Sequence, residues 1–284
     1  NFLLKIDNSI FEKNYNRLNG GGAINVLSNG DNTFISCEES LFVMNRSGAP
    51  GGALNIHTRR GYASNIRLKN CHFKGNNGNT SWGGALYIWG QLDGPDSRSY
   101  TEIENCLFTG NRGAIGLTNG QGGVADMYIR NSTFYNNGNR VIAKPWQETF
   151  SAYNYARITL ANTAFRRILS NNSPYHNLNM YRLDNCLISA GECPDLPGSE
   201  QACGQGMLYG LDPLFADSAG GDFRPLSCSP LIDAGDNQWL EDPTAQTDLA
   251  GLPRIHSGTV DIGAYEGLAF RAEAWQVAQY PLCH

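Results

Sequence analysis

Asn70-Cys71-His72-Phe73-Lys74-Gly75-Asn76 is the stretch that decides the fold, because its pattern recurs along most of the chain. The pattern is Asn, a small residue, any residue and a bulky apolar residue, often with a second Asn three positions later. Its copies begin at Asn8, Glu39, Asn70, Asn105, Asn131, Asn162 and Asn185. Successive copies start 23 to 35 residues apart, and self-similarity on this scale is typical of repeat architectures.

Short strands and corners are expected within each copy. Ile66 and Leu68 share one strand parity, whereas Cys71 and Phe73 share the other, so both pairs face inward only if the chain bends between them. Asn70 stands at that bend, and Asn tolerates the left-handed backbone that a sharp corner needs. A second corner is marked by small residues. These corners are Gly21-Gly22-Ala23, Gly51-Gly52-Ala53, Gly83-Gly84-Ala85 and, in reduced form, Gly113-Ala114.

Three short strands and three corners per copy predict an all-β fold, a parallel β-helix (solenoid) of about seven turns with a C-terminal capping region. Turns stacked at about 4.8 Å place like residues above one another, as columns of rings and amides. The predicted ladders are Asn8, Asn70, Asn105, Asn131, Asn162 and Asn185; Asn14, Asn45, Asn76, Asn111 and Asn137; and Phe11, Phe42, Phe73, Phe108, Phe134 and Phe165. A propeller blade needs about 40 residues, more than any spacing here, and an antiparallel sandwich does not explain the columns.

Composition agrees with this fold and excludes several others. The chain has 284 residues, with 33 Gly and 30 Asn, and both types favour turns over helix interiors. A helical bundle or a doubly wound α/β fold is therefore not expected. A formal charge of -5 with 21 Lys and Arg provides no basic stripe for nucleic acid. No run of 18 apolar residues is present, so no transmembrane segment is expected.

The cysteines indicate the compartment. Cys193 and Cys203 flank a loop rich in Pro and Gly, which predicts a disulfide-closed surface loop. Disulfides persist in oxidising compartments, so an extracellular or cell-surface location is expected. Cys71 and Cys106 occupy one column in successive copies, either as a second bridge or as stacked thiols.

The repeats resemble those of extracellular right-handed parallel β-helix proteins, including the polymorphic outer-membrane-protein type with its Gly-Gly-Ala-Ile and Phe-x-x-Asn motifs. Residues 208–267 resemble the C-terminal module of the choice-of-anchor Q group of bacterial surface proteins. The matching motifs are Asp212-Pro213-Leu214-Phe215, Ser229-Pro230-Leu231-Ile232-Asp233-Ala234-Gly235-Asp236 and Asp261-Ile262-Gly263-Ala264-Tyr265-Glu266. An anchor segment tends to follow such modules, but residues 268–284 fit no recognisable sorting signal, which leaves the mode of attachment open.

These features divide the chain into four parts. Residues 1–190 form the β-helix repeats, 191–207 the disulfide-closed loop, 208–267 the cap or anchor-type module, and 268–284 the tail. The first residues already fit the repeat, so the first turn exposes unpaired strand edges. Either a further N-terminal region or a neighbouring subunit is expected against that turn, and the second arrangement builds a filament.

Several residues are candidates for binding or catalysis. Aromatic rings stack on sugars, which makes Trp82, Tyr87, Trp89, Trp146, Tyr153 and Tyr155 candidate carbohydrate-binding residues, although packing as lids explains them as well. Carboxylates bind hard cations, which makes Asp233, Asp236 and Asp261 candidate ligands of a structural Ca²⁺, the only cofactor that the sequence suggests. The competing interpretation is a cap in which Asp233 and Asp261 accept backbone N–H bonds and pair with Arg254.

Two further sets carry weaker signals. The carboxylates of Asp93, Asp96, Glu102, Glu104, Asp126 and Asp184 are the candidates for a glycosidase pair. Glu102 and Glu104 share a parity and are expected to be solvent-facing surface residues. His57, Arg59, Arg60, Lys69 and His72 are the candidates for a basic groove that binds an acidic polysaccharide, against the simpler interpretation of solvated loops.

Function must be argued from a site, because this fold carries lyases, hydrolases, adhesins and structural proteins. With no phased catalytic set apparent, the sequence favours a bacterial cell-surface structural or adhesive protein that is not an enzyme and that self-associates through the exposed coil end. The alternative is a polysaccharide lyase, a hydrolase or a glycan-binding protein acting on an acidic polysaccharide.

Overall fold

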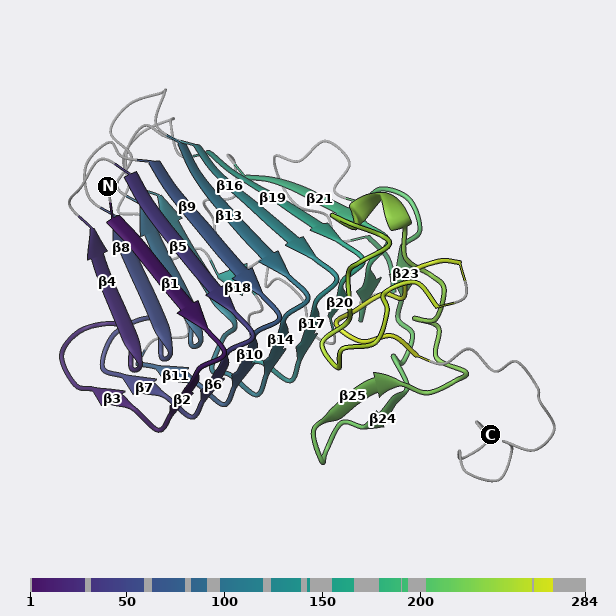
Figure 1. The fold of residues 1–284 in the computed structure, drawn as a ribbon, viewed down its shortest axis with the longest axis horizontal. Coiled ribbons are helices and arrows are strands. Elements are labelled where there is room, and N and C mark those ends of the chain that lie inside the picture. Colours follow the sequence, from purple (N-terminus) through teal and green to yellow (C-terminus); the bar gives the residue numbers. More distant parts are fainter. Residues whose placement is uncertain are drawn as a thin grey trace.

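The computed structural model describes residues 2–28, 32–58, 63–79, 83–90, 98–119, 124–138, 142–143, 155–165, 179–189, 191–193, 203–256 and 258–267. In these residues the chain winds into a parallel β-solenoid whose strands stack along one axis, with the N-terminal turn at one end and residues 203–267 at the other (Figure 1). The all-β prediction is confirmed. The sole described helix is the 3-10 turn η1, Asn237–Trp239, far too short to cross a membrane.

Two long parallel sheets run the length of the coil. The seven-stranded sheet has the order β1-β5-β9-β13-β16-β19-β21, and the eight-stranded sheet has the order β2-β6-β10-β14-β17-β20-β22-β23. The strands of the first are β1 Phe2–Asp7, β5 Asn32–Glu38, β9 Ala63–Lys69, β13 Arg98–Glu104, β16 Val124–Arg130, β19 Tyr155–Ala161 and β21 Asn179–Asp184. Those of the second are β2 Ile10–Glu12, β6 Leu41–Val43, β10 His72–Lys74, β14 Leu107–Thr109, β17 Thr133–Tyr135, β20 Ala164–Phe165, β22 Leu187–Ile188 and β23 Leu208–Tyr209.

Two smaller parallel sheets close the circuit. The three-stranded sheet contains β3 Tyr15–Asn16, β7 Arg46–Ser47 and β11 Asn77–Gly78. The five-stranded sheet contains β4 Ile24–Ser28, β8 Leu54–Thr58, β12 Leu86–Gly90, β15 Ile115–Asn119 and β18 Ile142–Ala143. Only the first turns place a strand in each of the four parallel sheets. The coil therefore has about four complete turns, whereas seven were predicted. Later turns continue in the two long sheets, and much of the chain that would complete their circuits lies outside the described residues.

The corners follow the predicted chemistry. The first residue of every copy has a left-handed backbone, with φ between 42° and 53°, including Glu39 where the Asn is replaced. At the second corner Gly51 has φ of 73°, a conformation that favours glycine. Gly52 is needed for a different reason, because a Cβ there would lie 2.3 Å from the carbonyl oxygen of Gly84 in the next turn.

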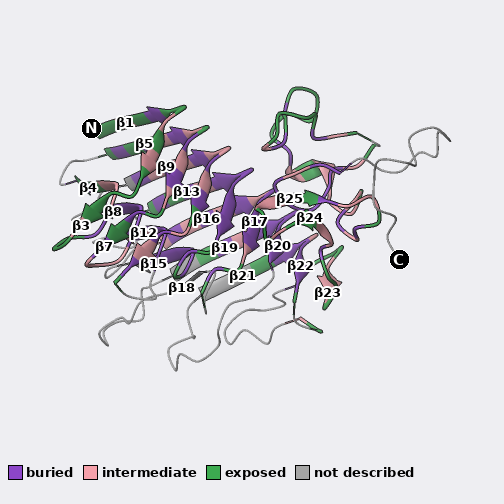
Figure 2. Ribbon diagram, turned by 90° about the horizontal axis from the view of Figure 1, so that it is seen from below, coloured by how far each residue is buried: buried purple, intermediate pink, exposed green. Residues whose placement is uncertain are grey.

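The Phe column fills the interior. Neighbouring rings from Phe11 to Phe165 are stacked, with centroids 4.7–5.2 Å apart and interplanar angles of 3–16°. Parallel in-register pairing produces this column, because Phe73 lies directly between Phe42 and Phe108. Burial is greatest in the middle turns and lowest in the N-terminal strands (Figure 2).

The second Asn column forms the predicted ladder. Each side-chain amide donates to the Oδ1 of the Asn in the next turn, over 2.8–3.0 Å from Asn14 to Asn137. The same Oδ1 also accepts a backbone N–H, as Asn76 Oδ1 does from Asn45. The other amide hydrogen goes back to a Phe carbonyl, for example from Asn76 to Phe42 at 2.8 Å. A buried amide therefore has its hydrogen-bonding groups satisfied within the column.

The first Asn column is not a continuous ladder, which corrects the prediction. Only Asn105 to Asn70 and Asn162 to Asn131 are bonded along it, at 2.6 and 3.0 Å. Asn105 Oδ1 and Asn131 Nδ2 are buried without a hydrogen-bond partner among the described residues, and other amides of the column bond to the C-terminal segment. Asn105, Asn162 and Asn185 donate to the carbonyls of Thr247, Asp236 and Ala234. These side chains fasten a later part of the chain to the flank of the coil.

Residues 203–267, called the C-terminal segment below, have two roles. Residues 203–210 add a last rung, in which the N–H groups of Gly204 and Leu208 donate to Leu183 and Cys186. The predicted Cys193–Cys203 disulfide joins this rung to the chain before it. Cys37, Cys71, Cys106 and Cys186 are free, buried thiols.

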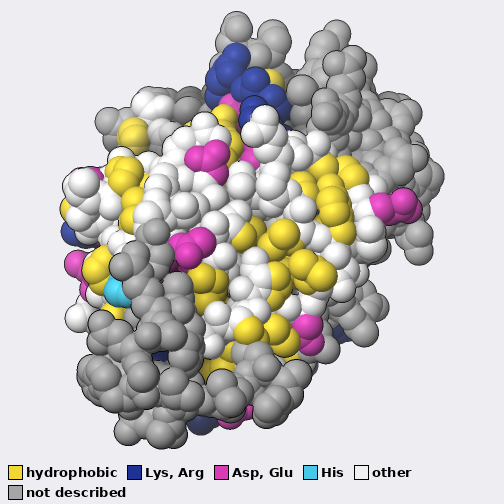
Figure 3. Space-filling view, turned by 90° about the vertical axis from the view of Figure 1, so that its right-hand side faces the viewer, with side chains coloured by type: hydrophobic (Ala, Val, Ile, Leu, Met, Phe, Trp, Pro, Cys, Tyr) yellow, Lys and Arg dark blue, Asp and Glu magenta, His cyan; other side chains and the backbone are white. Residues whose placement is uncertain are grey.

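The rest of the C-terminal segment covers a side of the coil rather than its open end. Leu231 and Ile262 pack on Ala164 and Leu187, which face outward from the eight-stranded sheet. The antiparallel pair β24 Phe215–Asp217 and β25 Asp222–Pro225 lies beside Tyr135. Viewed from this end of the molecule, apolar side chains gather in patches among uncharged polar groups (Figure 3).

Candidate functional site

The outer face of the seven-stranded sheet carries aligned rows of polar and aromatic side chains. Strand parity turns Ser99, Thr101 and Ile103 inward, so Tyr100 and Glu102 face out. The in-register pairing continues these positions on the neighbouring strands. One row reads Leu3, Phe34, Asn65, Tyr100, Asp126, Arg157, and the next reads Lys5, Ser36, Arg67, Glu102, Tyr128, Thr159.

A groove of about 400 Å³ lies on the N-terminal half of this face. Phe34 and Tyr100 are 42% and 40% exposed, so each presents part of its ring to solvent. Tyr100 lies 5.4 Å from Tyr128, measured between ring centroids, and burial raises its pKa. The side chains that line the groove, called the sheet groove below, are those of Leu3, Phe34, Ile35, Ser36, Glu38, Asn65, Ile66, Arg67, Tyr100 and Glu102.

Ion pairs fix the charged side chains of this face. Glu102 bridges Arg67 and Arg130. Further along, Arg157 donates two hydrogen bonds to the carboxylate of Asp126, at 2.6 and 2.8 Å. This pairing raises the pKa of Arg157. Bidentate pairs hold the guanidinium plane in one orientation, so the face is a fixed polar surface rather than a set of mobile charges.

The C-terminal segment borders the groove on one side. Glu241 pairs with Arg67 and Lys69. Gln246 donates to the carboxylate of Glu104, which is fully buried and lies 3.7 Å from the Lys69 ammonium. The prediction that Glu104 faces solvent is therefore wrong, because a segment 142 residues away in the sequence covers it. Glu102 remains partly exposed.

A buried ionic cluster holds the C-terminal segment together. The Arg254 side chain is 0% exposed, pairs with Glu266 at 3.1 Å and donates to the carbonyl of Gly263. The Asp248 and Asp261 carboxylates accept backbone N–H bonds nearby, as predicted for Asp261. Burial raises the pKa of Glu266 to about 8 and that of Asp261 to about 6. Three carboxyl groups therefore share one guanidinium in a region with little water.

Replacing Glu266 with Gln should weaken the pH dependence of stability. A carboxyl group with a raised pKa in the folded protein stabilises it fully below the unfolded value of 4.5, and this contribution is lost as the pH rises to about 8. Melting temperatures of the wild type should therefore fall between pH 5 and 8 more steeply than those of Glu266→Gln. The Asp261 carboxyl acts in the same direction but at lower pH, so a residual slope near pH 5 is expected in both. Equal slopes above pH 6 would contradict the assignment.

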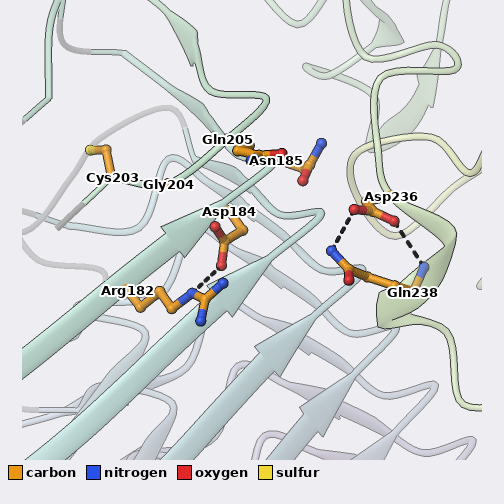
Figure 4. Close-up of a pocket in the computed structure, with 8 residues that line it drawn as sticks. All are labelled: Arg182, Asp184, Asn185, Cys203, Gly204, Gln205, Asp236 and Gln238. Carbon is orange, nitrogen blue, oxygen red and sulfur yellow. Dashed lines mark hydrogen bonds and ion pairs between the residues drawn. The ribbon is translucent and has the colours of Figure 1, made fainter. Parts of the chain in front are cut away.

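A second, polar pocket of about 590 Å³ lies beside the last described rung of the coil. Arg182 and Asp184 enter it from β21 and are joined by a 2.5 Å hydrogen bond, and Asp236 is bonded to Gln238 beside them (Figure 4). Asn185, Cys203, Gly204 and Gln205 complete the lining. Asp184 and Asp236, predicted for different roles, thus line one pocket, each held by a neighbouring side chain.

The two predicted carbohydrate-binding aromatics whose side chains are described, Tyr87 and Trp89, do not lie on the sheet groove. Tyr87 and Trp89 are on β12 of the five-stranded sheet, where the Trp89 ring lies 3.7 Å from that of His57. Trp82, Trp146 and Tyr153 lie outside the described residues. Tyr155 begins β19, and its side chain is likewise outside the described part. A role for these residues in glycan binding stays a prediction.

The predicted basic groove is not formed by the described residues. His57 lies on the five-stranded sheet, Lys69 on the seven-stranded sheet and His72 on the eight-stranded sheet, which are different sides of the coil. His72 lies 3.2 Å from the Thr109 hydroxyl, and burial lowers its pKa to about 4. Arg59, Arg60, Asp93 and Asp96 lie outside the described residues.

The predicted calcium ligands are not gathered. Asp236 caps the 3-10 turn, whereas Asp261 accepts the N–H groups of Asp233 and Gly267. Among the described residues no group of three His, Cys, Asp or Glu side chains is placed to hold a metal ion. The Asp236 and Asp261 carboxylates accept backbone N–H bonds, as the cap interpretation proposes for Asp261, whereas Asp233 contributes its own N–H as a donor, and Arg254 pairs with Glu266 rather than with Asp261.

Sequence reasoning named Glu102 as a solvent-facing candidate but missed the two rings of the sheet groove. Phe34 and Tyr100 belong to no motif, and the loops before their strands differ in length. Counting back from the repeated Asn aligns them, because Phe34, Asn65 and Tyr100 each lie five residues before Glu39, Asn70 and Asn105. This spacing is the feature of the sequence that could have identified the row of the sheet groove.

Comparison of the chain with protein-family models, with curated proteins and with solved structures gave no match. The parallel β-solenoid therefore rests on the structure itself.

Proposed function

We propose that this chain is an extracytoplasmic cell-surface protein with a structural or adhesive role, of the kind that its repeats and its C-terminal motifs resemble. The solenoid provides a stiff body, and the seven-stranded sheet presents a surface of fixed charges and exposed rings. The observation that carries the proposal is the pairing of Cys193 with Cys203 in a disulfide. Bridges of this kind persist where thiols are not kept reduced. Catalysis on a polysaccharide stays an alternative prediction.

Thiol trapping in the source cells tests the location. Cells are lysed in acid and alkylated under denaturing conditions before reduction, and the peptides are analysed by mass. Cys193 and Cys203 should escape alkylation, whereas the free thiols Cys37 and Cys106 serve as internal controls and should be labelled. Protease added to intact cells should degrade the protein. Alkylated Cys193, or full protection from the protease, would contradict the proposal.

Self-association through the N-terminal turn is the structural variant of this proposal. β1, β2, β3 and β4 each stand at the edge of their sheet, and Ile10 and Leu18 are 72% and 81% exposed. The Asn ladder also ends there, with Asn14 donating inward to Asn45 while its own Oδ1 accepts no bond among the described residues. Open edges of this kind pair readily with another chain.

Sedimentation velocity at increasing concentration should show oligomers if a second copy occupies this turn. Ile10→Lys should abolish them, since Lys on an edge strand opposes pairing. Met44→Lys is the matched control, because Met44 is also exposed and Lys13 already fills the equivalent corner one turn earlier. A monomer at all concentrations would sink the variant.

A further inference from the structure

We propose that the sheet groove binds a neutral polysaccharide, with Phe34 and Tyr100 as stacking platforms for sugar rings. This inference rests on the adhesive role proposed above, because it names the ligand to which the protein would adhere. The groove is built on strands of the rigid coil, so its side chains are positioned by the core beneath them. Both rings remain about two-fifths exposed, although Tyr100 packs beside Tyr128, so each still offers part of its surface to a ligand.

The two rings are placed for one extended ligand. Phe34 pairs in register with Asn65, and Asn65 pairs with Tyr100, so the rings stand two strands apart on one row. At about 4.8 Å per strand they are about 10 Å apart, with the Asn65 amide between them. A ligand lying across the strands therefore meets a ring, an amide and a second ring. Sugars offer that combination, since they have apolar C–H faces and a rim of hydroxyl groups.

The next row supplies partners for those hydroxyl groups. Ser36, Arg67 and Glu102 align two residues along the same strands, about 7 Å from the first row. Hydroxyl, guanidinium and carboxylate groups donate to or accept from sugar hydroxyls. A few polar groups beside apolar walls are the usual composition of a small-molecule or glycan site.

Charge selects a neutral ligand over an acidic one. The groove contains two carboxylates, Glu38 and Glu102, and one guanidinium, Arg67. Arg67 is already within ion-pair distance of Glu102, Glu104 and Glu241. Within the lining, an acidic polysaccharide would face two carboxylates, and the one guanidinium there is already engaged in ion pairs; the exposed Lys5, beside Ser36 in the second row, lies outside the lining. This differs from the acidic substrate expected from the sequence, which relied on a basic groove that the described residues do not form.

Affinity electrophoresis of the full chain tests the inference. Native gels contain soluble xyloglucan, galactomannan or β-1,3-glucan, with polygalacturonate as the acidic comparison. The wild type should be retarded by at least one neutral polymer and not by polygalacturonate. Tyr100→Ala and Phe34→Ala should each weaken binding about tenfold, or about 1.4 kcal/mol. Tyr15→Ala is the matched control, an exposed ring on β3 of another sheet, and should bind like the wild type.

Each outcome decides a different claim. Unchanged melting temperatures in the three variants ensure that lost retardation reports on the groove. Retardation by none of the neutral polymers, or equal loss in Tyr15→Ala, overturns the inference. Retardation by polygalacturonate alone overturns the argument that charge selects a neutral ligand. Binding of a protein partner to the groove, with no binding of a glycan, overturns the assignment of a polysaccharide as the ligand. The location proposed above depends on thiol trapping, so it can fail or stand independently.

Discussion

Replacing Phe108 with Ala should destabilise the protein by about 3–5 kcal/mol, the usual cost of removing a buried aromatic ring. Phe108 is completely buried and stacks on Phe73 and Phe134, with centroids 4.7 and 4.8 Å away. The surrounding backbone belongs to continuous parallel sheets, so it cannot collapse into the space without breaking the register of neighbouring turns. The midpoint of urea unfolding, followed by circular dichroism, measures the effect.

Phe11→Ala is the control for that result. Phe11 occupies the same column but is only half-buried and has a single stacked neighbour, Phe42, at 4.9 Å. Its loss should cost clearly less, because one face of the ring is already open. Equal costs at the two positions would mean that stacking within the column does not set the stability of the coil.

Arg254→Ala is expected to cost a comparable 3–5 kcal/mol and to loosen the C-terminal segment. The substitution leaves the buried carboxyl groups of Glu266, Asp248 and Asp261 without their cation. Limited proteolysis should then cleave within residues 211–267 while the coil stays intact. Urea unfolding and the masses of the proteolytic fragments together measure the two effects.

Two variants separate charge from bulk. Arg224 is exposed and pairs with Asp222 at 2.5 Å, so Arg224→Ala should change stability by no more than about 1 kcal/mol. In the double variant Arg254→Met, Glu266→Leu both partners become apolar, and much of the lost stability should return. If the double variant is no more stable than Arg254→Ala, loss of the Arg254–Glu266 pair is not the cause.

The repeat made the interior of this protein readable from sequence. Columns such as Phe42, Phe73 and Phe108 depend only on residues a fixed distance from a corner, and local chemistry marks each corner. The left-handed backbone at Asn70 and the close approach at Gly52 follow from the same local rules. These parts were predictable because stacked neighbours repeat one another.

What the sequence did not reveal depends on contacts between distant segments. The amides of Asn105 and Asn162 bond within their column and also donate outside it, because the C-terminal segment offers carbonyl groups nearby. Glu104 is buried for the same reason. His57 and His72 were grouped by nearness in sequence, although a solenoid places residues 15 apart on different sides. The sheet groove was hidden because its row crosses four strands and lies within no single motif.

The attachment of the C-terminal segment also bears on how such a chain can change in length. Among the described residues, its bonds to the coil begin at Arg67 and reach Asn185, so they span every turn from the third onward. Duplicating or deleting a unit within that span would move the Asn residues out of step with the carbonyl groups they hold. In the described part of the first two turns no such tie is present. Evolutionary gain or loss of whole units should therefore be tolerated there, and the later units should be inherited as one block.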